Sequence, residues 1–487
     1  MSYIELHACS AFSFLRGGSF PEQLAETAAE LEMPALALLD RDGVYGAPRF
    51  SVAAREDNVR PIIGCDLTME DSVALPVLVE TRAGYKNLCE LLTQAHLRSE
   101  KSKSAVRWSE LAEFAEGLVA FLGSTGCQPV VCGSLPQTSS VRQAAGRDRL
   151  AACAPQNPAE HAQCLIDAFG RENVFVEIQR HFLRGEEQIN RQLVDLAAHY
   201  RLSILATNGV HYAKPYGRQV VDAFTCIREH THLDAAGKLL TQNSERHLKS
   251  DAEMRALFRD LPEAIENTTR LAERLKFSLE DIGYEFPSFP VPDGHSMDSF
   301  LRTIVWFGAQ QRYAAISDAV KRQLEEELAL IQKLGFPGYF LIVWDIVNFC
   351  REHNVMVQGR GSAANSAVCY CLGITPVDPV SNHLVFERFL SEGRKGWPDI
   401  DLDLPSGDRR ESVIQEIYRR YGKRGAAMTA NVITYRGRSA AREIGKALNF
   451  SPDIIDRFSH LFASGDFPHT LELASQIEQA GLPKEHP

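Results

Sequence analysis

Apolar residues in the first part of the chain alternate between short continuous runs and helical spacing. The continuous runs predict buried strands over residues 34–40, 60–66, 117–123, 173–179 and 203–212. Apolar residues three and four positions apart predict helices over residues 21–32, 81–96 and 186–200. Strands that alternate with helices predict an α/β domain with parallel strands, which can close as a barrel.

Two segments interrupt this rhythm. Residues 125–157 are rich in Cys, Ser, Gln, Gly and Pro and have no period. They predict a surface insertion, because loops tolerate extra length at little cost in free energy. The proline-rich segment 285–294 predicts a connector between domains. Beyond it, a charged helix is predicted over 319–334, followed by the aromatic segment 335–353.

Composition narrows the class of protein only slightly. Hydrophobic residues make up 45% and charged residues 24%, an ordinary balance for a folded protein. The chain has no apolar run near the roughly 18–20 residues of a membrane span and no secretory signal, so we expect a cytoplasmic protein without a membrane partner. The eleven cysteines lack the CxxC spacing of zinc sites. The net charge of −11 is weak evidence against a DNA partner, because such binding depends on a local basic groove.

A glycine-rich turn in residues 357–373 is the first candidate for chemistry. Gly359 and Gly361 allow the backbone to turn tightly and approach a ligand closely. Ser362 stands where a helix N-cap belongs, and free N–H groups at the start of the predicted helix would suit a triphosphate. Arg360 adds a planar fork for phosphate oxygens. Taken alone, the segment is also compatible with an ordinary capped turn.

Three carboxylates recur at every second position further along the chain. Asp399, Asp401 and Asp403 alternate with aliphatic residues, and the period of a strand places all three on one face. Like charges on one face repel, so a cation is expected there, and carboxylate oxygens suit Mg²⁺. Two such ions about 3.5–4 Å apart activate a 3′-hydroxyl and stabilise a leaving pyrophosphate. A calcium loop or a solvated acidic strand is the alternative.

The runs at 335–349, 359–366 and 378–422 resemble the palm of bacterial family C DNA polymerases, the class of the replicative polymerase III α subunit. They read GFPGYFLIVWDIVNF, GRGSAANS and DPVSNHLVFERFLSEGRKGWPDIDLDLPSGDRRESVIQEIYRRYG. Within that family, ELHACSAFSFLRG near the start, LPVLVETRAGYKNLCELLT and AAMTANVITYRGRSAAREIGKAL resemble the error-prone, damage-inducible branch.

The resemblance implies an α/β chain in several parts. A distorted β/α barrel of the polymerase-and-histidinol-phosphatase (PHP) type is expected over residues 1–275, with 125–157 as the insertion. A connector over 276–298 would lead to a nucleotidyltransferase-like α+β palm of the polymerase β type over 299–425. The start of a helical thumb is expected over 426–487.

The resemblance also implies roles for individual residues. Asp401 and Asp403 would be two members of a catalytic triad that holds Mg²⁺, and Asp399 would be structural. The incoming triphosphate would contact Arg360, Gly361, Ser362 and Arg388. Primer-template DNA would contact the basic segment that contains Arg436, Arg438, Arg442 and Lys446. A structural ion pair for Arg388 and a solvated helix face for the basic segment are the alternatives.

The PHP-type part departs from its family at the metal ligands. Active PHP domains begin with His-x-His, where this chain has His-Ala-Cys at 7–9. Their Asp-His pair is Asp-Arg at 40–41 here, and the late Asp-x-His is Gly-Val-His at 209–211. The loss of three ligands and the fixed charge of Arg41 predict a vestigial site, with metal absent or weakly bound. The candidates that remain for this vestigial site are His7, Asp40, Asp66, His181 and His211.

The implied function is that of an error-prone DNA-directed DNA polymerase, a nucleotidyltransferase that adds deoxynucleoside triphosphates to a primer end during translesion synthesis. In this family the third aspartate, the fingers and the regions that contact the sliding clamp and mutasome proteins follow the thumb. The sequence ends at residue 487, so we expect a truncated chain that does not extend primers alone. The alternatives are a PHP-type metal phosphoesterase or exonuclease, and a non-catalytic module that binds DNA or mutasome proteins.

Overall fold

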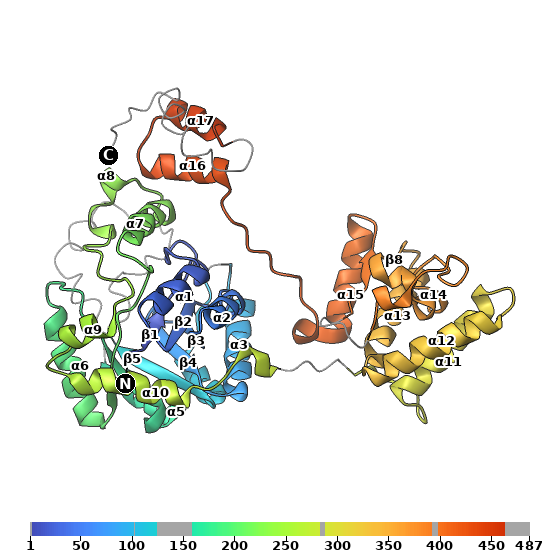
Figure 1. Cartoon of the computed structure of the whole chain (residues 1–487), viewed down its shortest axis with the longest axis horizontal. Coiled ribbons are helices and arrows are strands. Elements are labelled where there is room, and N and C mark those ends of the chain that lie inside the picture. Colours follow the sequence, from blue (N-terminus) through green and yellow to red (C-terminus); the bar gives the residue numbers. More distant parts are fainter. Residues whose placement is uncertain (1, 102, 124–157, 283–287, 392–397, 463–487) are drawn as a thin grey trace. The chain divides into compact units, whose positions relative to one another are not determined.

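The computed structural model describes residues 2–101, 103–123, 158–282, 288–391 and 398–462 (Figure 1). The predicted insertion over 125–157 lies outside these residues. Met1–Ile282 together with Thr434–Pro487 form the first compact unit, and Gly283–Ile433 form the second. The domain boundaries inferred from the resemblance stay predictions.

The first unit contains a seven-stranded sheet whose spatial order follows the sequence. Its strands are β1 (Glu5–Ala8), β2 (Ala35–Arg41), β3 (Arg60–Thr68), β4 (Ala74–Val79), β5 (Leu118–Gly123), β6 (Val174–Ile178) and β7 (Ser203–Ala206). Four of the five predicted strands are confirmed to within two residues at each end, whereas β7 ends earlier than its predicted segment.

The sheet is mixed: the five strands predicted from the sequence all run in one direction, but β4, which was not predicted, runs in the opposite one. β4 runs antiparallel to both β3 and β5, and the other neighbouring strands are parallel. The loop from β3 to β4 covers only residues 69–73. A parallel connection needs a crossover of about a dozen residues or more, whereas an antiparallel one needs only a short turn.

The two edges of the sheet approach each other at one end. Ala8 at the end of β1 forms a bridge with Val210, which follows β7. The N–H of Cys9 donates to the carbonyl of Val210 at 2.9 Å, and the N–H of Val210 donates to the carbonyl of His7 at 2.8 Å. The predicted distorted barrel is confirmed in this form, and the bridge brings the first and last predicted ligand motifs together.

Helices surround this sheet (Figure 1). They are α1 (Pro21–Glu30), α2 (Ala47–Glu56), α3 (Arg82–Arg98), α4 (Leu111–Phe114), α5 (Pro158–Phe169), α6 (Glu186–Tyr200), α7 (Gly217–Arg228), α8 (Leu233–Ala236), α9 (Asp251–Leu257) and α10 (Pro262–Arg274). The three helices predicted in this unit are confirmed as α1, α3 and α6. β2 is buried at every position but its last, because both faces of the sheet are covered there.

Two further helices of the first unit come from the end of the described chain. They are α16 (Gly437–Ala447) and α17 (Pro452–His460). Ala447 and Ile444 of α16 pack in an apolar cluster with Ala223 and Cys226 of α7. This small cluster attaches the basic segment to the PHP-type unit.

The second unit is mainly helical. Its elements are α11 (Met297–Arg312), α12 (Asp318–Lys333), α13 (Pro337–Glu352), β8 (Gln358–Arg360), α14 (Ala367–Cys371), β9 (Asp401–Asp403) and α15 (Asp408–Gly425). The helix predicted over 319–334 is confirmed as α12. Leu324, Phe340 and Phe389 are buried in the core between these helices.

Within the described ranges, no single helix is long and apolar enough to cross a membrane. α12 and α13, which meet at a bend of 115°, pass the same test of length and composition only as a pair. The apolar side chains of both helices contribute to the buried core of the second unit.

Candidate functional sites

β8 and β9 place the predicted phosphate-binding arginine beside the predicted metal-binding carboxylates. The strands are antiparallel, and Arg360 is directly opposite Asp401. Side chains that oppose each other across a strand pair lie on the same face. The Nε of Arg360 lies 3.1 Å from Oδ1 of Asp403 and 3.9 Å from Oδ2 of Asp401. The structure therefore brings these three predicted residues together.

All three side chains of this cluster are accessible to solvent. Arg360, Asp401 and Asp403 are 61%, 57% and 62% exposed. Exposed ion pairs are screened by water and contribute about 1 kcal/mol or less each. The ion pairs of Arg360 with Asp401 and Asp403 are therefore weak.

The predicted alternation of polar and apolar positions is confirmed around β9. Asp399, Asp401 and Asp403 are exposed, and the aliphatic residues at 400, 402 and 404 are half-buried. Asp399 lies before the strand begins. The N–H of Ile400 donates to the hydroxyl of Tyr339 at 2.8 Å, which fixes the start of β9 to α13.

The turn that follows β8 faces the carboxylates with bare backbone. Gly361 has a φ of +69°, a conformation that glycine adopts without strain. A Cβ at this position would lie 3.9 Å from Oδ2 of Asp401 and would meet no other atom within 4 Å. A methyl group at Gly361 would already contact Asp401, so the bare backbone of the turn lies close to this carboxylate.

The prediction that Ser362 caps an α-helix was wrong. Gly361–Asn365 form a short 3-10 helix, and α14 starts only at Ala367, with Ser366 as its N-cap. The left-handed backbone at Gly361 cannot continue into an α-helix, and the side-chain amide of Asn365 donates back to the carbonyl of Ser362 at 2.9 Å. The N-cap Ser366 accepts from the N–H of Cys369 at 3.0 Å.

The N-terminus of α14 is also unavailable to a triphosphate, contrary to prediction. The buried carboxylate of Glu327 in α12 accepts hydrogen bonds from the N–H groups of Ala367 and Val368 at 2.9 and 3.0 Å. Burial raises the pKa of Glu327 above its ordinary value, although these hydrogen bonds oppose the shift. Gly361 and Ser362 remain candidates through the 3-10 turn, whose first N–H groups have no acceptor within the helix itself.

Arg388 lies in a second 3-10 turn, Phe386–Arg388, which packs beside the turn Gly361–Asn365. Its side chain is exposed and the flanking Phe386 and Phe389 are buried. The structure thus brings the backbone of Arg388 near the phosphate-binding candidates, and its role stays a prediction.

The basic segment around α16 is only partly neutralised. Arg442 pairs with Asp456 of α17 at 2.7 Å, and Lys446 pairs with Glu443 at 2.6 Å. Arg436 and Arg438 are exposed and have no acidic partner among the described residues. These two arginines are therefore the better candidates to contact DNA phosphates. DNA binding by this segment stays a prediction.

In the first unit, the predicted ligand His7 is paired with a carboxylate that the sequence analysis missed. Nδ1 of His7 lies 2.7 Å from Oε1 of Glu177, which is fully buried in β6. Burial lowers the pKa of His7, but the charge and hydrogen bond of Glu177 outweigh it and raise the pKa to about 9. The pair engages Nδ1, one of the two ring nitrogens of His7.

Two further predicted ligands are occupied by protein groups. Asp40 is buried and accepts from the N–H of Ser10 at 2.9 Å and the hydroxyl of Ser13 at 2.8 Å. Nη1 of Arg41 lies 3.0 Å from Oδ2 of Asp66. Those two side chains are only 15% and 16% exposed. Arg41 thus binds the carboxylate that would otherwise face a metal.

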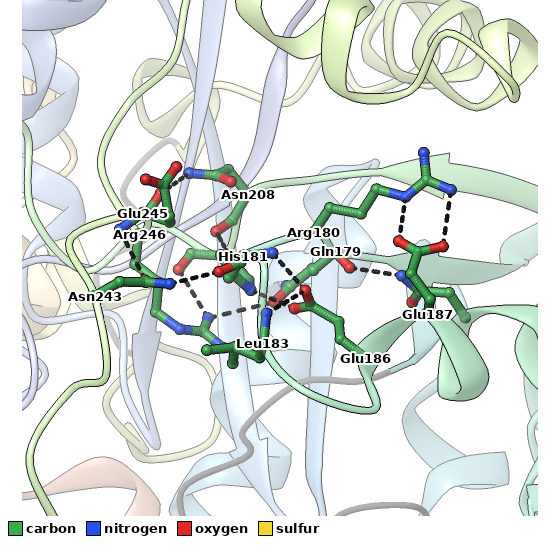
Figure 2. A network of polar contacts seen from close by, with 12 residues as sticks. Gln179, Arg180, His181, Leu183, Glu186, Glu187, Asn208, Asn243, Glu245 and Arg246 are labelled. Carbon is green, nitrogen blue, oxygen red and sulfur yellow. Dashed lines mark hydrogen bonds and ion pairs between the residues drawn. The ribbon is translucent and has the colours of Figure 1, made fainter.

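His181 belongs to a network of polar contacts that includes Arg246 (Figure 2), and the N–H of His211 donates to the carbonyl of Arg246 at 2.9 Å. Both ring nitrogens of His181 are engaged, Nδ1 with Glu186 at 2.9 Å and Nε2 with the carbonyl of Asn208 at 2.9 Å. The guanidinium of Arg246 donates to the carbonyl of Gly209 at 3.1 Å. Burial and the positive charge of Arg246 hold the pKa of His211 well below its ordinary value.

The structure leaves little room for a side chain at position 209, where active PHP domains have an aspartate. Gly209 has a φ of +52°, and a Cβ there would lie 2.6 Å from Nε2 of Gln179 and 2.7 Å from Nη1 of Arg246. An aspartate side chain does not fit while these two residues keep their places. In the described part of the chain, no group of three or more His, Cys, Asp or Glu residues is arranged to hold a metal. The residues of the first unit do not fit the metal cluster of active PHP domains.

Comparison with known proteins agrees with the motifs. Residues 299–485 match the family described as the bacterial DNA polymerase III alpha NTPase domain, and residues 5–181 match the PHP domain. The predicted resemblance to bacterial family C DNA polymerases is confirmed. Proteins named error-prone DNA polymerase from Mycolicibacterium paratuberculosis, Mycobacterium bovis and Nocardia farcinica are 43%, 44% and 39% identical to this chain.

The alignments cover 98%, 94% and 99% of this chain but 44%, 42% and 46% of those relatives. The chain thus spans less than half the length of the curated relatives it matches. Likeness to solved structures is weak: a match to an amidohydrolase from Chromobacterium violaceum has 11% identity and a TM-score of 0.24, over 43% of this chain and 88% of that one.

Proposed function

We propose that this chain provides nucleotide- and metal-binding elements of an error-prone DNA polymerase that acts in translesion synthesis. The observation that carries the proposal is the β8–β9 pair, which brings Arg360, Asp401 and Asp403 together beside the bare turn at Gly361. The relatives named error-prone DNA polymerase support the assignment to that branch. The substrates would be deoxynucleoside triphosphates and primer-template DNA, and we expect a cytoplasmic protein.

Asp401 and Asp403 are suited to hold Mg²⁺. Their carboxylates lie on one exposed face, and oxygen ligands with open positions for water and phosphate suit this ion. When bound, Mg²⁺ would neutralise charge on the triphosphate and favour attack by the primer hydroxyl. Arg360, Gly361, Ser362 and Arg388 would bind and orient the phosphates. We propose contacts with the sliding clamp and with mutasome proteins only for the whole polymerase.

The proposal is tested by nucleotide binding to the full chain. A fluorescent deoxynucleoside triphosphate should bind in the presence of Mg²⁺, and Asp401→Asn or Asp403→Asn should weaken this binding about tenfold or more, because a metal ligand is lost. Asp399→Asn is the matched control, since Asp399 lies outside β9 and should leave the affinity within about twofold. Equal effects of all three substitutions, or no binding by the unaltered chain, would contradict the proposed site.

A phosphoesterase activity of the first unit is not favoured. Three of the predicted metal ligands already contact protein groups. Glu177 pairs with His7, the hydroxyl of Ser13 donates to Asp40, and Arg41 pairs with Asp66. We infer that this site is structural. Manganese-dependent 3′-exonuclease activity that disappears with His7→Ala would overturn this inference.

A further inference from the structure

Glu327 stands out as a fully buried carboxylate whose two oxygens are both engaged. Oε2 accepts from the hydroxyl of Ser366 at 2.7 Å and the N–H of Val368 at 3.0 Å. Oε1 accepts from the N–H of Ala367 and the side-chain amide of Gln323, both at 2.9 Å. A buried carboxylate is costly unless its oxygens are hydrogen-bonded, so these four contacts make one stable arrangement.

These contacts fix one end of the turn that faces Asp401. Ser366 and Ala367 directly follow the 3-10 helix Gly361–Asn365. At the other end, β8 is held by its pairing with β9 and by the N–H of Gly359, which donates to the carbonyl of Ile374 at 2.7 Å. The turn is therefore anchored on β9 at its start and on α12 at its end.

Between these anchors the turn is held by the fully buried side chain of Ala363, which belongs to the core of the second unit, and by two hydrogen bonds. The N–H of Ser366 donates to the carbonyl of Ala363 at 3.1 Å, and the side chain of Asn365 donates to the carbonyl of Ser362. Gly361 has no side chain to hold its conformation. Gly361 and Ser362 precede the buried Ala363, so the anchor at Glu327 is one of the contacts that set how their backbone faces Asp401.

We propose that Glu327 is a positioning residue for triphosphate binding, acting through Ser366 and Ala367 on the turn at Gly361 and Ser362. It touches no substrate itself, because it is fully buried. This role rests on the proposed nucleotide site. It adds to that site a residue, Glu327, that lies far from Gly361 and Asp401 in the sequence. Preorganised donors bind more tightly than mobile ones, since less conformational entropy is lost on binding.

Glu327→Gln tests the role with little change in shape. The glutamine amide places two N–H donors where a carboxylate oxygen accepted, so donors then face donors at the start of α14. We expect deoxynucleoside triphosphate affinity to fall about tenfold. Affinity of the Asp401–Asp403 pair for Mn²⁺, followed by electron paramagnetic resonance without nucleotide, should stay within about twofold, because β9 does not depend on Glu327.

Glu326→Gln is the matched control. Glu326 is the neighbouring residue on α12 and is exposed. The same substitution there should leave both affinities unchanged. A merely structural role for Glu327 would lower Mn²⁺ and nucleotide binding together, whereas the positioning role lowers only nucleotide binding.

The outcomes separate the two proposals. Absence of nucleotide binding by the unaltered chain refutes the proposed function, whereas binding that is equal in Glu327→Gln and the unaltered chain overturns the positioning role alone. Parallel loss of Mn²⁺ and nucleotide binding overturns it as well. If Glu327→Gln does not fold, Ser366→Ala decides: it removes one of the four contacts and should weaken nucleotide binding about threefold with Mn²⁺ affinity unchanged. An unchanged nucleotide affinity in that variant also rejects the role.

Discussion

Arg360 lies between the carboxylates that would hold Mg²⁺, so its removal should affect metal and nucleotide in opposite directions. In Arg360→Gln the metal no longer competes with a guanidinium for Asp401 and Asp403. The N–O distances of 3.1 and 3.9 Å permit real attraction, but all three side chains are more than half exposed. Such pairs are worth about 0.2–1 kcal/mol each, so the loss of both should raise Mn²⁺ affinity about twofold to thirtyfold.

The same substitution should weaken triphosphate binding. The guanidinium offers two parallel N–H groups to phosphate oxygens, and a charge-assisted contact of this kind is worth about 1.5–3 kcal/mol. Fluorescent deoxynucleoside triphosphate binding at saturating Mg²⁺ should therefore fall by about tenfold or more. The gain in metal affinity should shrink as salt rises, because dissolved ions weaken the attraction between solvent-exposed charges.

Arg322→Gln is the control for a change of net charge alone. Arg322 is exposed on α12 and has no ion pair among the described residues. Mn²⁺ titration by electron paramagnetic resonance and nucleotide titration by fluorescence measure the two effects separately. A loss of both affinities in Arg360→Gln would refute the reasoning, because it would mean that the arginine supports the β8–β9 pair rather than competing with the metal.

Two further predictions concern the first unit. Gly209→Asp, which restores the family's residue, should cost about 2–3 kcal/mol in the free energy of unfolding, because the new side chain meets two close neighbours. Gly185→Asp also has a positive φ, +85°, but no other atom lies within 4 Å of its Cβ, so it should cost only about 1 kcal/mol; equal costs in urea unfolding would contradict the steric account. The second prediction concerns pH. The pKa of His7 is raised from 6.5 to about 9 in the folded protein, so protonated His7 stabilises the fold fully below pH 6.5. This contribution to the free energy of unfolding declines as the pH rises through 9. The decline amounts to about 3 kcal/mol and should be absent in His7→Ala; a decline that persists there rules out His7 as its source.

The sequence predicted those elements whose periodicity is local. The alternation around Asp401 predicted the carboxylate face, and continuous apolar runs predicted strands such as β2 and β6. β4 was not predicted as a strand, and the antiparallel pairing that its short loop 69–73 imposes appears only in the structure. Side-chain period therefore gives the face of an element but not its partner.

Glu327 shows what pattern analysis can miss and why. It lies among three successive glutamates on a helix that was predicted as charged. Helical spacing nevertheless places it with Leu324, Leu328 and Ile331, which are all buried. A carboxylate on an apolar stripe signals a buried acceptor, but only the fold shows that its donors are Ser366 and two N–H groups of α14. Glu177 gives the same signal, because it is an isolated glutamate in the apolar strand β6. The structure shows that its partner is His7.

Each unit contains an arginine beside carboxylates that relatives of its type would offer to a metal, and burial decides what that arginine does. Arg41 lies 3.0 Å from Asp66 and Arg360 lies 3.1 Å from Asp403, so distance does not separate them. The first pair is about 15% exposed, and breaking such a pair costs about 3–5 kcal/mol because a charge is left buried. The second pair is about 60% exposed, and water compensates each partner when they separate. We therefore expect Arg41 to stay bound to Asp66 and Arg360 to exchange its carboxylates for the phosphates of an incoming nucleotide.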